Sequence, residues 1–396
     1  MIEALAMGAL AIVLYVYAVF PLLVFARGWL LRRPWMQEDR TPRIDVVIVC
    51  HNEAAHIAEK LRNVLASDYP LKRLRIIVAS DGSDDGTDEI VRRMDCEAMT
   101  LLSFPRRGKI PALNDAVAVA AGELLVFSDA NSQFAPDALR NLARHFADSR
   151  VGCVAGNQVY TNSAKAGAAA SGERSYWSFD RALKVAGSRA GNTISATGAI
   201  YAIRRELFQE VPSGVTDDFT VSTRVILQGY RMVFDPAAVA REPVAGKPRA
   251  EFRRKVRVMT RGLRAVWIVR RLLNPFHFGF YSLQLFSHKV LRRLVVFPLL
   301  LLLILVPWMW LAGGWLAVVA ALELAFYGLA AAGYLLSATR MGRWPPLALP
   351  HFFCLVNVAA MVATINVLLG RTIERWESHR AEPPQEAPQA SMASTR

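Results

Sequence analysis

The chain has 396 residues, of which 53% are hydrophobic and 20% are charged, and its formal net charge at pH 7 is +14. In a soluble protein this charge would favour a nucleic-acid partner, but here much of it flanks long apolar runs. Anionic lipid headgroups fit such charges better, so membrane lipids are expected as partners and nucleic acid is not. The four cysteines are far apart and match no metal-ligand spacing, which favours reduced thiols.

The first apolar run has no charged residue from Ala4 to Phe25, close to the ~20 residues that cross a bilayer. Segment 1–31 is therefore predicted to be a transmembrane helix. A cleaved signal peptide is the weaker interpretation, because no basic residue precedes the run and three arginines follow it. Segment 294–370 is expected to hold about three further transmembrane helices. Its apolar runs are Leu294–Ala312, Trp315–Leu336 and Leu347–Gly370.

Basic residues at the ends of the runs predict the side of the membrane for the central segment. They are Arg27, Arg32, Arg33, Lys289, Arg292 and Arg293. Because such residues favour the cytosolic side, the protein is expected to be a multi-pass membrane protein with its central domain in the cytosol. The same rule puts the C-terminal tail outside, where its arginines are disfavoured, so the last run is the least secure span. Residues 381–396, rich in Pro, Gln, Ala and Ser, are predicted to be disordered.

After the first run, short apolar segments rich in β-branched residues alternate with helical segments. Strands are expected at Ile44–Cys50, Leu74–Ser80, Ala98–Phe104 and Glu123–Ser128. Helices are expected at Glu53–Ala66, Gly86–Met94 and Ile110–Ala121. This alternation predicts an α/β domain over residues 43–240, with a mostly parallel sheet and helices on both faces.

Polar residues cluster where these strands end, which is the edge at which such sheets bind ligands. The clusters are His51-Asn52-Glu53, Asp81-Gly82-Ser83-Asp84-Asp85-Gly86 and Asp129-Ala130-Asn131. The sequence has neither GxGxxG after the first strand nor a glycine-rich loop ending in Lys-Ser/Thr, which argues against a dinucleotide fold or a P-loop. Carboxylates would repel a diphosphate unless a divalent cation mediates. The oxygens of Asp129 and Asn131 are of the kind that Mg²⁺ or Mn²⁺ prefers.

Five motifs in order, between residues 43 and 264, resemble the family 2 glycosyltransferases of the GT-A fold. The resemblance is to the membrane-bound branch that includes polysaccharide synthases and ceramide glucosyltransferase. The motifs are Asn52-Glu53, Asp81-Gly82-Ser83-Asp84-Asp85-Gly86-Thr87, Gly108-Lys109 with Leu113-Asn114, Asp129-Ala130-Asn131 and Thr216-Asp217-Asp218. The last two are similar to the family's Asp-x-Asp and Thr-Glu-Asp. Each motif alone is weak, whereas five in register are a strong signal.

The resemblance implies a binding site for a nucleotide sugar, expected to be UDP-linked. Asn52, Glu53 and Asp81 would hold the nucleoside, with Asp81 near the base, and Lys109 would lie along the same pocket. Asp129 would coordinate a metal ion that bridges the diphosphate and helps it to leave.

The resemblance also implies an inverting displacement. Asp218 would be the general base that deprotonates the acceptor hydroxyl, with Asp217 supporting it. The hydroxyl would then attack the anomeric carbon from the face opposite UDP. A purely structural alternative is that Thr216-Asp217-Asp218 simply caps a helix at Phe219–Gln228, and capping is compatible with catalysis.

The sequence departs from the family pattern at two places. Asn131 replaces the second acidic residue of the metal motif, which weakens the attraction for a metal without abolishing it. Arg254 and Arg257 fit the family's Arg-x-x-Arg-Trp motif and would face the diphosphate, but the tryptophan is missing, which argues against processive synthesis. The pair Tyr176-Trp177 resembles an acceptor-side segment, where aromatic rings stack on sugars or simply pack.

The segment 249–290 is predicted to lie at the membrane surface. Its first part, Arg249–Asn274, has one apolar helical face and a basic remainder, followed directly by several aromatic residues. An amphipathic helix in the cytosolic headgroup layer is favoured over a solvated helix packed on the domain.

The sequence therefore predicts an inverting transferase that moves sugar from a nucleotide-diphosphate donor to a membrane-associated lipid or saccharide acceptor. Two enzyme versions remain open, assembly of a polysaccharide and addition of one sugar to a lipid. The rival from another class is a non-catalytic membrane protein that binds a nucleotide sugar as a sensor or assembly factor. A transporter is disfavoured by the lack of an internal repeat and of buried charges in the apolar runs.

Overall fold

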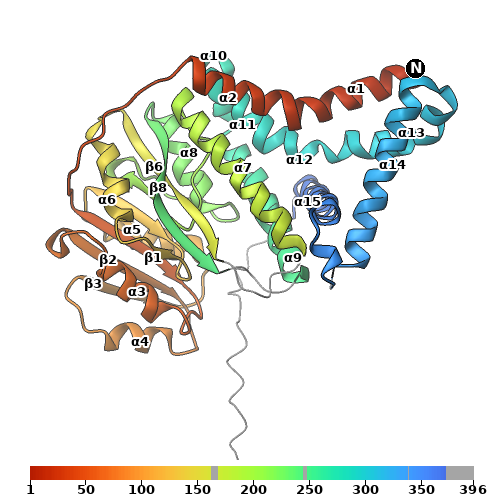
Figure 1. Cartoon of the computed structure of the whole chain (residues 1–396). Helices are drawn as coiled ribbons and strands as arrows, with labels where there is room; N and C mark the ends of the chain where they lie inside the picture. Colours follow the sequence, from red (N-terminus) through yellow and green to blue (C-terminus); the bar gives the residue numbers. More distant parts are fainter. Residues whose placement is uncertain (162–167, 244–247, 338, 372–396) are drawn as a thin grey trace, which may run out of the picture.

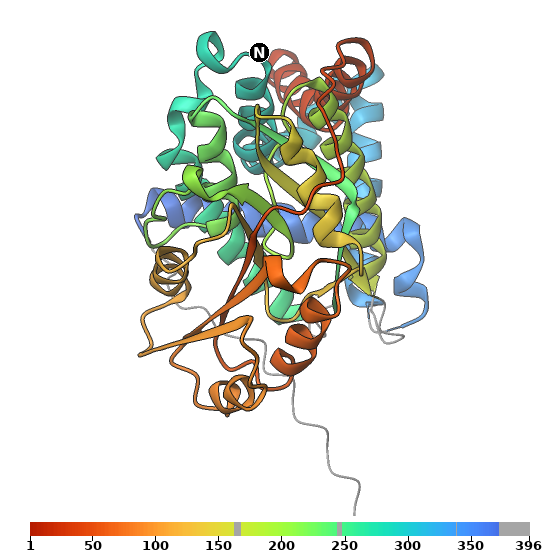
Figure 2. The same cartoon turned by 90° about the vertical axis from the view of Figure 1, so that its left-hand side faces the viewer.

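The computed structural model describes residues 1–161, 168–243, 248–337 and 339–371. The tail 381–396, predicted to be disordered, lies outside these residues. A sheet with helices on both faces forms one part of the molecule, and long apolar helices lie to one side of it (Figures 1 and 2).

The sheet has eight strands in the order β3-β2-β1-β4-β7-β6-β8-β5. β3, β2, β1 and β4 are parallel, β7 is antiparallel to both of its neighbours, and β6 and β8 are again parallel. The strands are β1 (Ile44–Cys50), β2 (Leu74–Asp81), β3 (Met99–Phe104), β4 (Leu124–Ser128), β5 (Gln133–Phe134), β6 (Val151–Thr161), β7 (Tyr201–Arg204) and β8 (Arg231–Pro243). The predicted mostly parallel sheet is thereby confirmed.

The strand β1 shows why this sheet has helices on both faces. All of its residues are buried, which matches the continuous apolar run expected of a parallel strand covered on both sides. Val47 and Val49 belong to a core with residues of α5 (Lys109–Ala118) and α8 (Asp217–Leu227). Alternate residues belong to a second core, with α3 (Ile57–Leu65) and α6 (Ala138–Ala143).

The helix predicted at Glu53–Ala66 begins later, at Ile57. The reason is that the backbone N–H groups of Asn52, Glu53 and Ala54 donate to side chains of the loop after β2. Those acceptors are Ser83 Oγ, Thr87 Oγ1 and Asp85 Oδ2. These bonds fasten the loops after β1 and β2 together at the carboxyl edge, and α4 (Thr87–Arg93) follows.

The helix predicted at Phe219–Gln228 begins earlier, at Asp217. Thr216 occupies the N-cap position, but its side chain makes no capping hydrogen bond. The hydroxyl of Thr216 therefore does not cap the helix, whereas Oδ1 of Asp218 accepts a hydrogen bond from the backbone N–H of Phe219. Asp217 and Asp218 instead lie in the first turn of α8, where the positive end of the helix dipole stabilises carboxylates.

Three helices among the described residues are long and apolar enough to cross a membrane: Ile2–Leu30, α14 (Gly314–Leu335) and α15 (Pro345–Leu368). A bent pair, Phe280–Leu294 and Val296–Ala312, would make a fourth. Ile2–Leu30 comprises α1 (Ile2–Leu14), a π-helical turn and α2 (Phe20–Leu30). Figure 1 shows α15 end-on and α14 lengthwise, so the two helices cross rather than lie parallel.

The N-terminal helix is attached to the sheet domain through α7 (Ala168–Ala190). Phe20 and Val24 of α2 form a buried cluster with Leu183 and Ala186 of α7. Gly28 makes the closest approach, because a Cβ placed there would lie 2.5 Å from the carbonyl oxygen of Ala186. The contact therefore requires glycine at this position.

We expect Gly28→Ala to weaken this attachment and to lower the unfolding temperature, since the added methyl group meets backbone and overpacking typically destabilises by about 1–3 kcal/mol. Gly8→Ala is the matched control, because a Cβ at Gly8 meets nothing within 4 Å. Alanine favours a helix over glycine, so the control should be neutral or stabilising. Thermal unfolding of both variants in detergent measures the difference, and equal midpoints would contradict the assigned contact.

The basic helix predicted at Arg249–Asn274 is α9 (Pro248–Ile268), followed by a short 3₁₀ turn. α9 packs against α15 and α8. Val256, Ala265 and Val266 are buried in these contacts, whereas Val258 and Trp267 are exposed. One face of α9 is thus packed on the protein, and its placement in a headgroup layer stays a prediction.

Candidate active site

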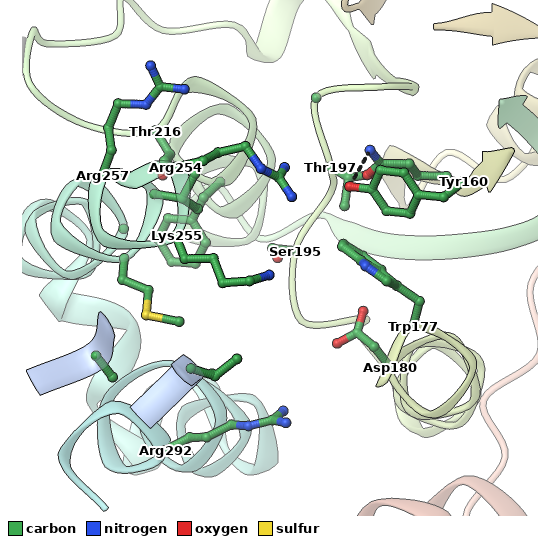
Figure 3. A pocket seen from close by; sticks show the side chains of 18 of the residues that line it. Tyr160, Trp177, Asp180, Ser195, Thr197, Thr216, Arg254, Lys255, Arg257 and Arg292 are labelled. Atoms are coloured by element: carbon green, nitrogen blue, oxygen red, sulfur yellow. Dashed lines mark hydrogen bonds between the residues drawn. The ribbon is translucent and has the colours of Figure 1, made fainter. Parts of the chain in front are cut away.

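A cavity of about 1000 Å³ lies between the carboxyl edge of the sheet, α7, α9, α15 and the segment before α13 (Val296–Ala312). Figure 3 shows Arg254 and Lys255 of α9 pointing across it toward Tyr160 and Trp177, while Arg257 points in a different direction. Many of the predicted site residues line this cavity: Glu53, Lys109, Asp129, Asn131, Trp177, Asp217, Asp218, Arg254 and Arg257.

Lys109 joins the two predicted carboxylate motifs. Its Nζ lies 3.1 Å from Oδ1 of Asp129 and 3.0 Å from Oδ2 of Asp217. Burial alone would lower the pKa of Lys109, but the two carboxylates raise it above its usual value, so the ammonium stays charged. One cation therefore holds together two acidic residues that are far apart in the sequence.

The neighbouring carboxylates Asp217 and Asp218 have opposite pKa shifts. Burial would raise the pKa of Asp217, but Lys109 and Arg261 hold it below its usual value. Burial and the charge of Asp217 raise the pKa of Asp218. Two carboxylates whose pKa values are shifted in opposite directions provide one group that stays charged and one that accepts a proton more readily. General acid–base catalysis requires such a difference.

Arg261 of α9 positions the chain just before this pair. Its guanidinium is buried and donates two hydrogen bonds, of 2.9 and 2.6 Å, to the carbonyl oxygen of Val215. The start of α8 is thereby fixed by a helix from outside the sheet domain.

The surroundings of Asp129 fit a divalent cation in part. Glu53 and Glu242 lie close enough that burial and the charge of Asp129 raise the pKa of both, that of Glu53 to about 7. The amide nitrogen of Asn131 donates to Glu242 over 3.2 Å, which leaves its carbonyl oxygen as the possible ligand. No three acidic, His or Cys side chains among the described residues gather closely enough to hold a metal ion. The phosphate oxygens of a ligand would have to complete the coordination.

Gly198 makes room for the Asp129 carboxylate. A Cβ at Gly198 would lie 2.9 Å from Oδ2 of Asp129, the oxygen that is not paired with Lys109. The neighbouring residues Ser195, Ala196 and Thr197 also line the cavity. This short segment between α7 and β7 therefore shapes one wall of the site.

We expect Gly198→Ala to lower sugar-transfer activity by about tenfold or more, because the methyl group displaces a carboxylate oxygen of the site, and small misplacements of reacting groups are costly. The clash involves the end of a side chain that can rotate, so the unfolding temperature should change little. Gly328→Ala is the control, since a Cβ there meets nothing within 4 Å. Steady-state kinetics measures the expected loss of activity in both variants, and thermal unfolding measures their stability. Unchanged kinetics would show that the space beside Asp129 is not needed.

Asn52 and Asp81 are not among the described residues that line the cavity. The Asp81 carboxylate is fully buried and accepts hydrogen bonds from the backbone N–H groups of Arg107 and Gly108 and from the Arg106 guanidinium. Asn52 exchanges hydrogen bonds with Asp84. Both residues thus organise the loops beside the cavity, and their contact with a nucleoside stays a prediction.

The predicted aromatic pair is only partly described. The side chain of Tyr176 lies outside the described residues. Trp177 lines the cavity, and its ring centroid lies 5.3 Å from that of Tyr160. Tyr160, on β6, was not predicted and adds a second aromatic surface to the site.

Several site residues escaped the sequence prediction, chiefly Gly198, Glu242, Asp180, Lys184 and Tyr160. They belong to none of the five motifs, and Glu242, Asp180 and Gly198 contact residues that are distant in the chain. Asn131 and Glu242, for example, are separated by 111 positions. The polar segment Ser195–Gly198 was the one local signal in the sequence that could have indicated a site residue, Gly198.

Comparison with known proteins identifies the family. Residues 42–265 match the family described as "Glycosyltransferase like family 2". The chain belongs to this family. The predicted resemblance is therefore confirmed, and the chain is a family 2 glycosyltransferase with long apolar helices beside its catalytic fold.

Among curated proteins, the chain is 27% identical over 216 residues to a poly-β-1,6-N-acetyl-D-glucosamine synthase of Staphylococcus aureus. It is 26% identical over 222 residues to an N-acetylglucosaminyltransferase of Rhizobium leguminosarum bv. viciae. Each match covers 52% of this chain and 52% of the relative, so the chain spans about half the length of the curated relatives it matches.

A solved structure matches over a greater length. The mannosyltransferase PcManGT from Pyrobaculum calidifontis, determined in complex with GDP-mannose and Mn²⁺, superposes with a TM-score of 0.68 at 26% identity. The match covers 93% of this chain and 99% of that protein. The likeness therefore includes the apolar helices as well as the sheet domain of this glycosyltransferase.

Proposed function

We propose that this glycosyltransferase moves a sugar from a nucleotide-diphosphate donor to a membrane-associated acceptor, with inversion at the anomeric carbon. The observation that carries the proposal is Lys109, whose ammonium lies about 3 Å from both Asp129 and Asp217. Asp129, proposed on the donor side, and Asp217, proposed beside the base, are thus held together at one end of the cavity.

The donor is proposed to lie against Glu53, Lys109 and Asp129, with its diphosphate facing Arg254. Arg257, which also lines the cavity but points in a different direction, would have to turn to reach the diphosphate. Asp129 and the carbonyl oxygen of Asn131 would hold Mg²⁺ or Mn²⁺ together with phosphate oxygens, and the cation would supply charge neutralisation of the leaving diphosphate. A UDP sugar is the proposed donor on the resemblance, and the names of the curated relatives support N-acetylglucosamine as the sugar. The GDP-mannose bound by PcManGT is the alternative to test beside it.

In the proposed step the acceptor hydroxyl oxygen forms a bond to the anomeric carbon. The bond between that carbon and the diphosphate oxygen breaks, and its electron pair leaves with the nucleoside diphosphate. The hydroxyl proton passes to Asp218. Asp217 stays charged beside Lys109 and raises the proton affinity of Asp218. Arg261 keeps the pair in place through the Val215 carbonyl.

The arrangement in the membrane is part of the proposal. The helices Ile2–Leu30, Val296–Ala312, α14 and α15 form a multi-pass frame, and the sheet domain lies in the cytosol, where nucleotide sugars are made available. Either polysaccharide or glycolipid biosynthesis fits this frame. The rival is a non-catalytic nucleotide-sugar-binding membrane protein, but the opposite pKa shifts of Asp217 and Asp218 support the catalytic proposal.

We expect the transfer rate to fall on acidification at a pH above the ~4 of an ordinary aspartate, because a base must be deprotonated and the pKa of Asp218 is raised. Asp217→Asn removes the adjacent negative charge, lowers the pKa of Asp218 and should move this acid limb to lower pH. The kcat profile of both proteins between pH 4 and 8 provides the measurement. An acid limb at the same pH in wild type and in Asp217→Asn would contradict the electrostatic coupling between Asp217 and Asp218.

The whole proposal is tested with the purified protein in membrane lipid extract, a panel of labelled UDP and GDP sugars, and Mn²⁺ or EDTA. Transfer of label from one donor to organic-soluble or polymeric product, lost with EDTA, supports it. A product of fixed size indicates single addition, and a ladder of sizes indicates polymerisation. Donor binding without any transfer to these acceptors would favour the non-catalytic rival.

A further inference from the structure

The side chain of Glu242, near the end of β8, connects the metal motif with the strand β6. Its Oε1 accepts a hydrogen bond of 3.2 Å from the amide nitrogen of Asn131, and its Oε2 accepts one from Nε2 of Gln158. All three residues line the cavity. A carboxylate from outside the five motifs thus contacts the amide that stands where the family's metal motif has its second acid.

The short strand β5 explains why these two residues meet. It pairs antiparallel with β8, so that Gln133 lies opposite Arg241 and Phe134 lies opposite Ala240. The backbone N–H of Ala135 continues this contact with a hydrogen bond to the carbonyl oxygen of Val239. The pairing brings the end of the metal motif beside the last residues of β8, although the two segments are more than a hundred positions apart.

Hydrogen bonds fix the backbone on both sides of Asn131. The hydroxyl of the buried Ser132 donates to the carbonyl oxygen of Asp129 over 2.9 Å. The side chain of Asn63 on α3 exchanges two hydrogen bonds, of 2.7 and 2.9 Å, with the backbone of Phe134. Because the backbone is held, rotation of the side-chain amide is the main freedom left to Asn131.

The chemistry of Glu242 determines how this amide is turned. An ionised carboxylate offers only acceptors, so the NH₂ group of Asn131 must point to Glu242 and its carbonyl oxygen must point away. The carbonyl oxygen is the atom of an asparagine that binds Mg²⁺ or Mn²⁺. Gln158 holds Glu242 in place, because its nitrogen also donates to Oη of Tyr160 over 3.1 Å, the bond drawn at Tyr160 in Figure 3.

We propose that Glu242 is a positioning residue that presents the carbonyl oxygen of Asn131 to the divalent cation of the donor site. The two residues then form one unit, and the carboxylate explains why an asparagine stands at position 131. An aspartate there would place two carboxylates face to face without a proton donor between them, which like charges disfavour. The inference rests on the proposed function, in which Asp129 and Asn131 hold the cation together with the donor diphosphate.

A double-mutant cycle on Mn²⁺ affinity tests this role without requiring turnover. Mn²⁺ is titrated by calorimetry into the full chain in detergent, once with saturating UDP and once with saturating GDP. Glu242→Gln is expected to weaken Mn²⁺ binding about tenfold, as loss of a residue that orients a metal ligand typically does. The reason is that the new amide faces two NH₂ groups and can accept from only one, so the orientation of Asn131 is no longer fixed.

The opposite effect is expected in the Asn131→Asp background. There Glu242→Gln should tighten Mn²⁺ binding by about threefold or more, because it removes the repulsion between two carboxylates and lets an N–H donate to the new one. Glu242→Leu, whose side chain neither donates nor accepts, removes the same repulsion and repeats the cycle with the same reversal of sign. The test therefore does not depend on the folding of one variant.

A change of the same direction in both backgrounds would overturn the proposal, since loss of an attractive charge or of stability acts alike in both. Unchanged Mn²⁺ affinity of Glu242→Gln in the otherwise wild-type chain would overturn it too. Glu206→Gln is the matched control, because Glu206 is exposed in the 3₁₀ turn Arg205–Leu207 and outside the described cavity lining. It should leave Mn²⁺ affinity unchanged.

The wild-type protein separates this inference from the proposed function. If it binds no Mn²⁺ with either nucleotide, the proposed function fails. If it binds Mn²⁺ but the reversal of sign is missing, the positioning role of Glu242 fails and the proposed function stands.

Discussion

The variant Asp218→Asn is expected to lower kcat by about 10²- to 10⁴-fold, the usual contribution of a general base. Asparagine keeps the size of the side chain but cannot accept the proton of the acceptor hydroxyl. Its affinity for the nucleotide sugar should stay within a few-fold of wild type, because the ammonium of Lys109 pairs with Asp129 and Asp217 and not with Asp218. Single-turnover transfer and donor binding, measured separately, check both parts.

The matched control is Asp68→Asn, which removes an exposed carboxylate paired with Arg140 on the surface. It should leave both kcat and donor affinity unchanged, since exposed ion pairs contribute about 0–1 kcal/mol to stability. If Asp218→Asn retains wild-type turnover in purified membranes, the base has been assigned to the wrong residue.

The variant Asp129→Ala is expected to lower Mn²⁺-dependent donor affinity and turnover by at least about 100-fold. Loss of a residue that merely orients a metal ligand typically lowers metal affinity or activity by about 10- to 100-fold, and Asp129 is proposed as the ligand itself. The substitution also leaves Lys109 paired with Asp217 alone. Calorimetric titration of the donor into the protein, repeated at increasing Mn²⁺ concentration, measures the donor affinity and its dependence on Mn²⁺.

Asn131→Ala provides the graded comparison for Asp129→Ala. A neutral carbonyl ligand contributes less to cation binding than a carboxylate, so its effect should be clearly smaller. Donor affinity that depends on Mn²⁺ as strongly in Asp129→Ala as in wild type would mean that the cation is held elsewhere.

The sheet was largely predictable because its signals are local. The strand expected at Ile44–Cys50 has those bounds, and the polar residues that follow three parallel strands converge at one edge. The start of α3 was not predictable in this way. Its position depends on hydrogen bonds from Asn52, Glu53 and Ala54 to a loop some thirty residues later, for example 31 positions from Asn52 to Ser83.

The cavity was only half predictable, for the same physical reason. The carboxylates at its sheet edge occur in recognisable motifs, whereas the basic side chains that line its other end are assembled by packing of α7, α9 and the stretch before α13. Lys289 and Arg292 were interpreted from sequence as topology signals, since flanking cations of an apolar run have that meaning. Only the folded chain brings them near Asp180, which is more than a hundred residues earlier: Asp180 and His288 are 3.5 Å apart.

The single ammonium of Lys109 has a consequence for the order of events in a catalytic cycle. Asp129 and Asp217 share its charge, so an anionic substrate that attracts the ammonium leaves Asp217 less compensated and increases the proton affinity of the adjacent Asp218. By reciprocity, protonation of Asp218 must then tighten binding of that substrate by the same factor. Under the proposed function, Asp218 would therefore become a stronger base once the anionic donor is bound.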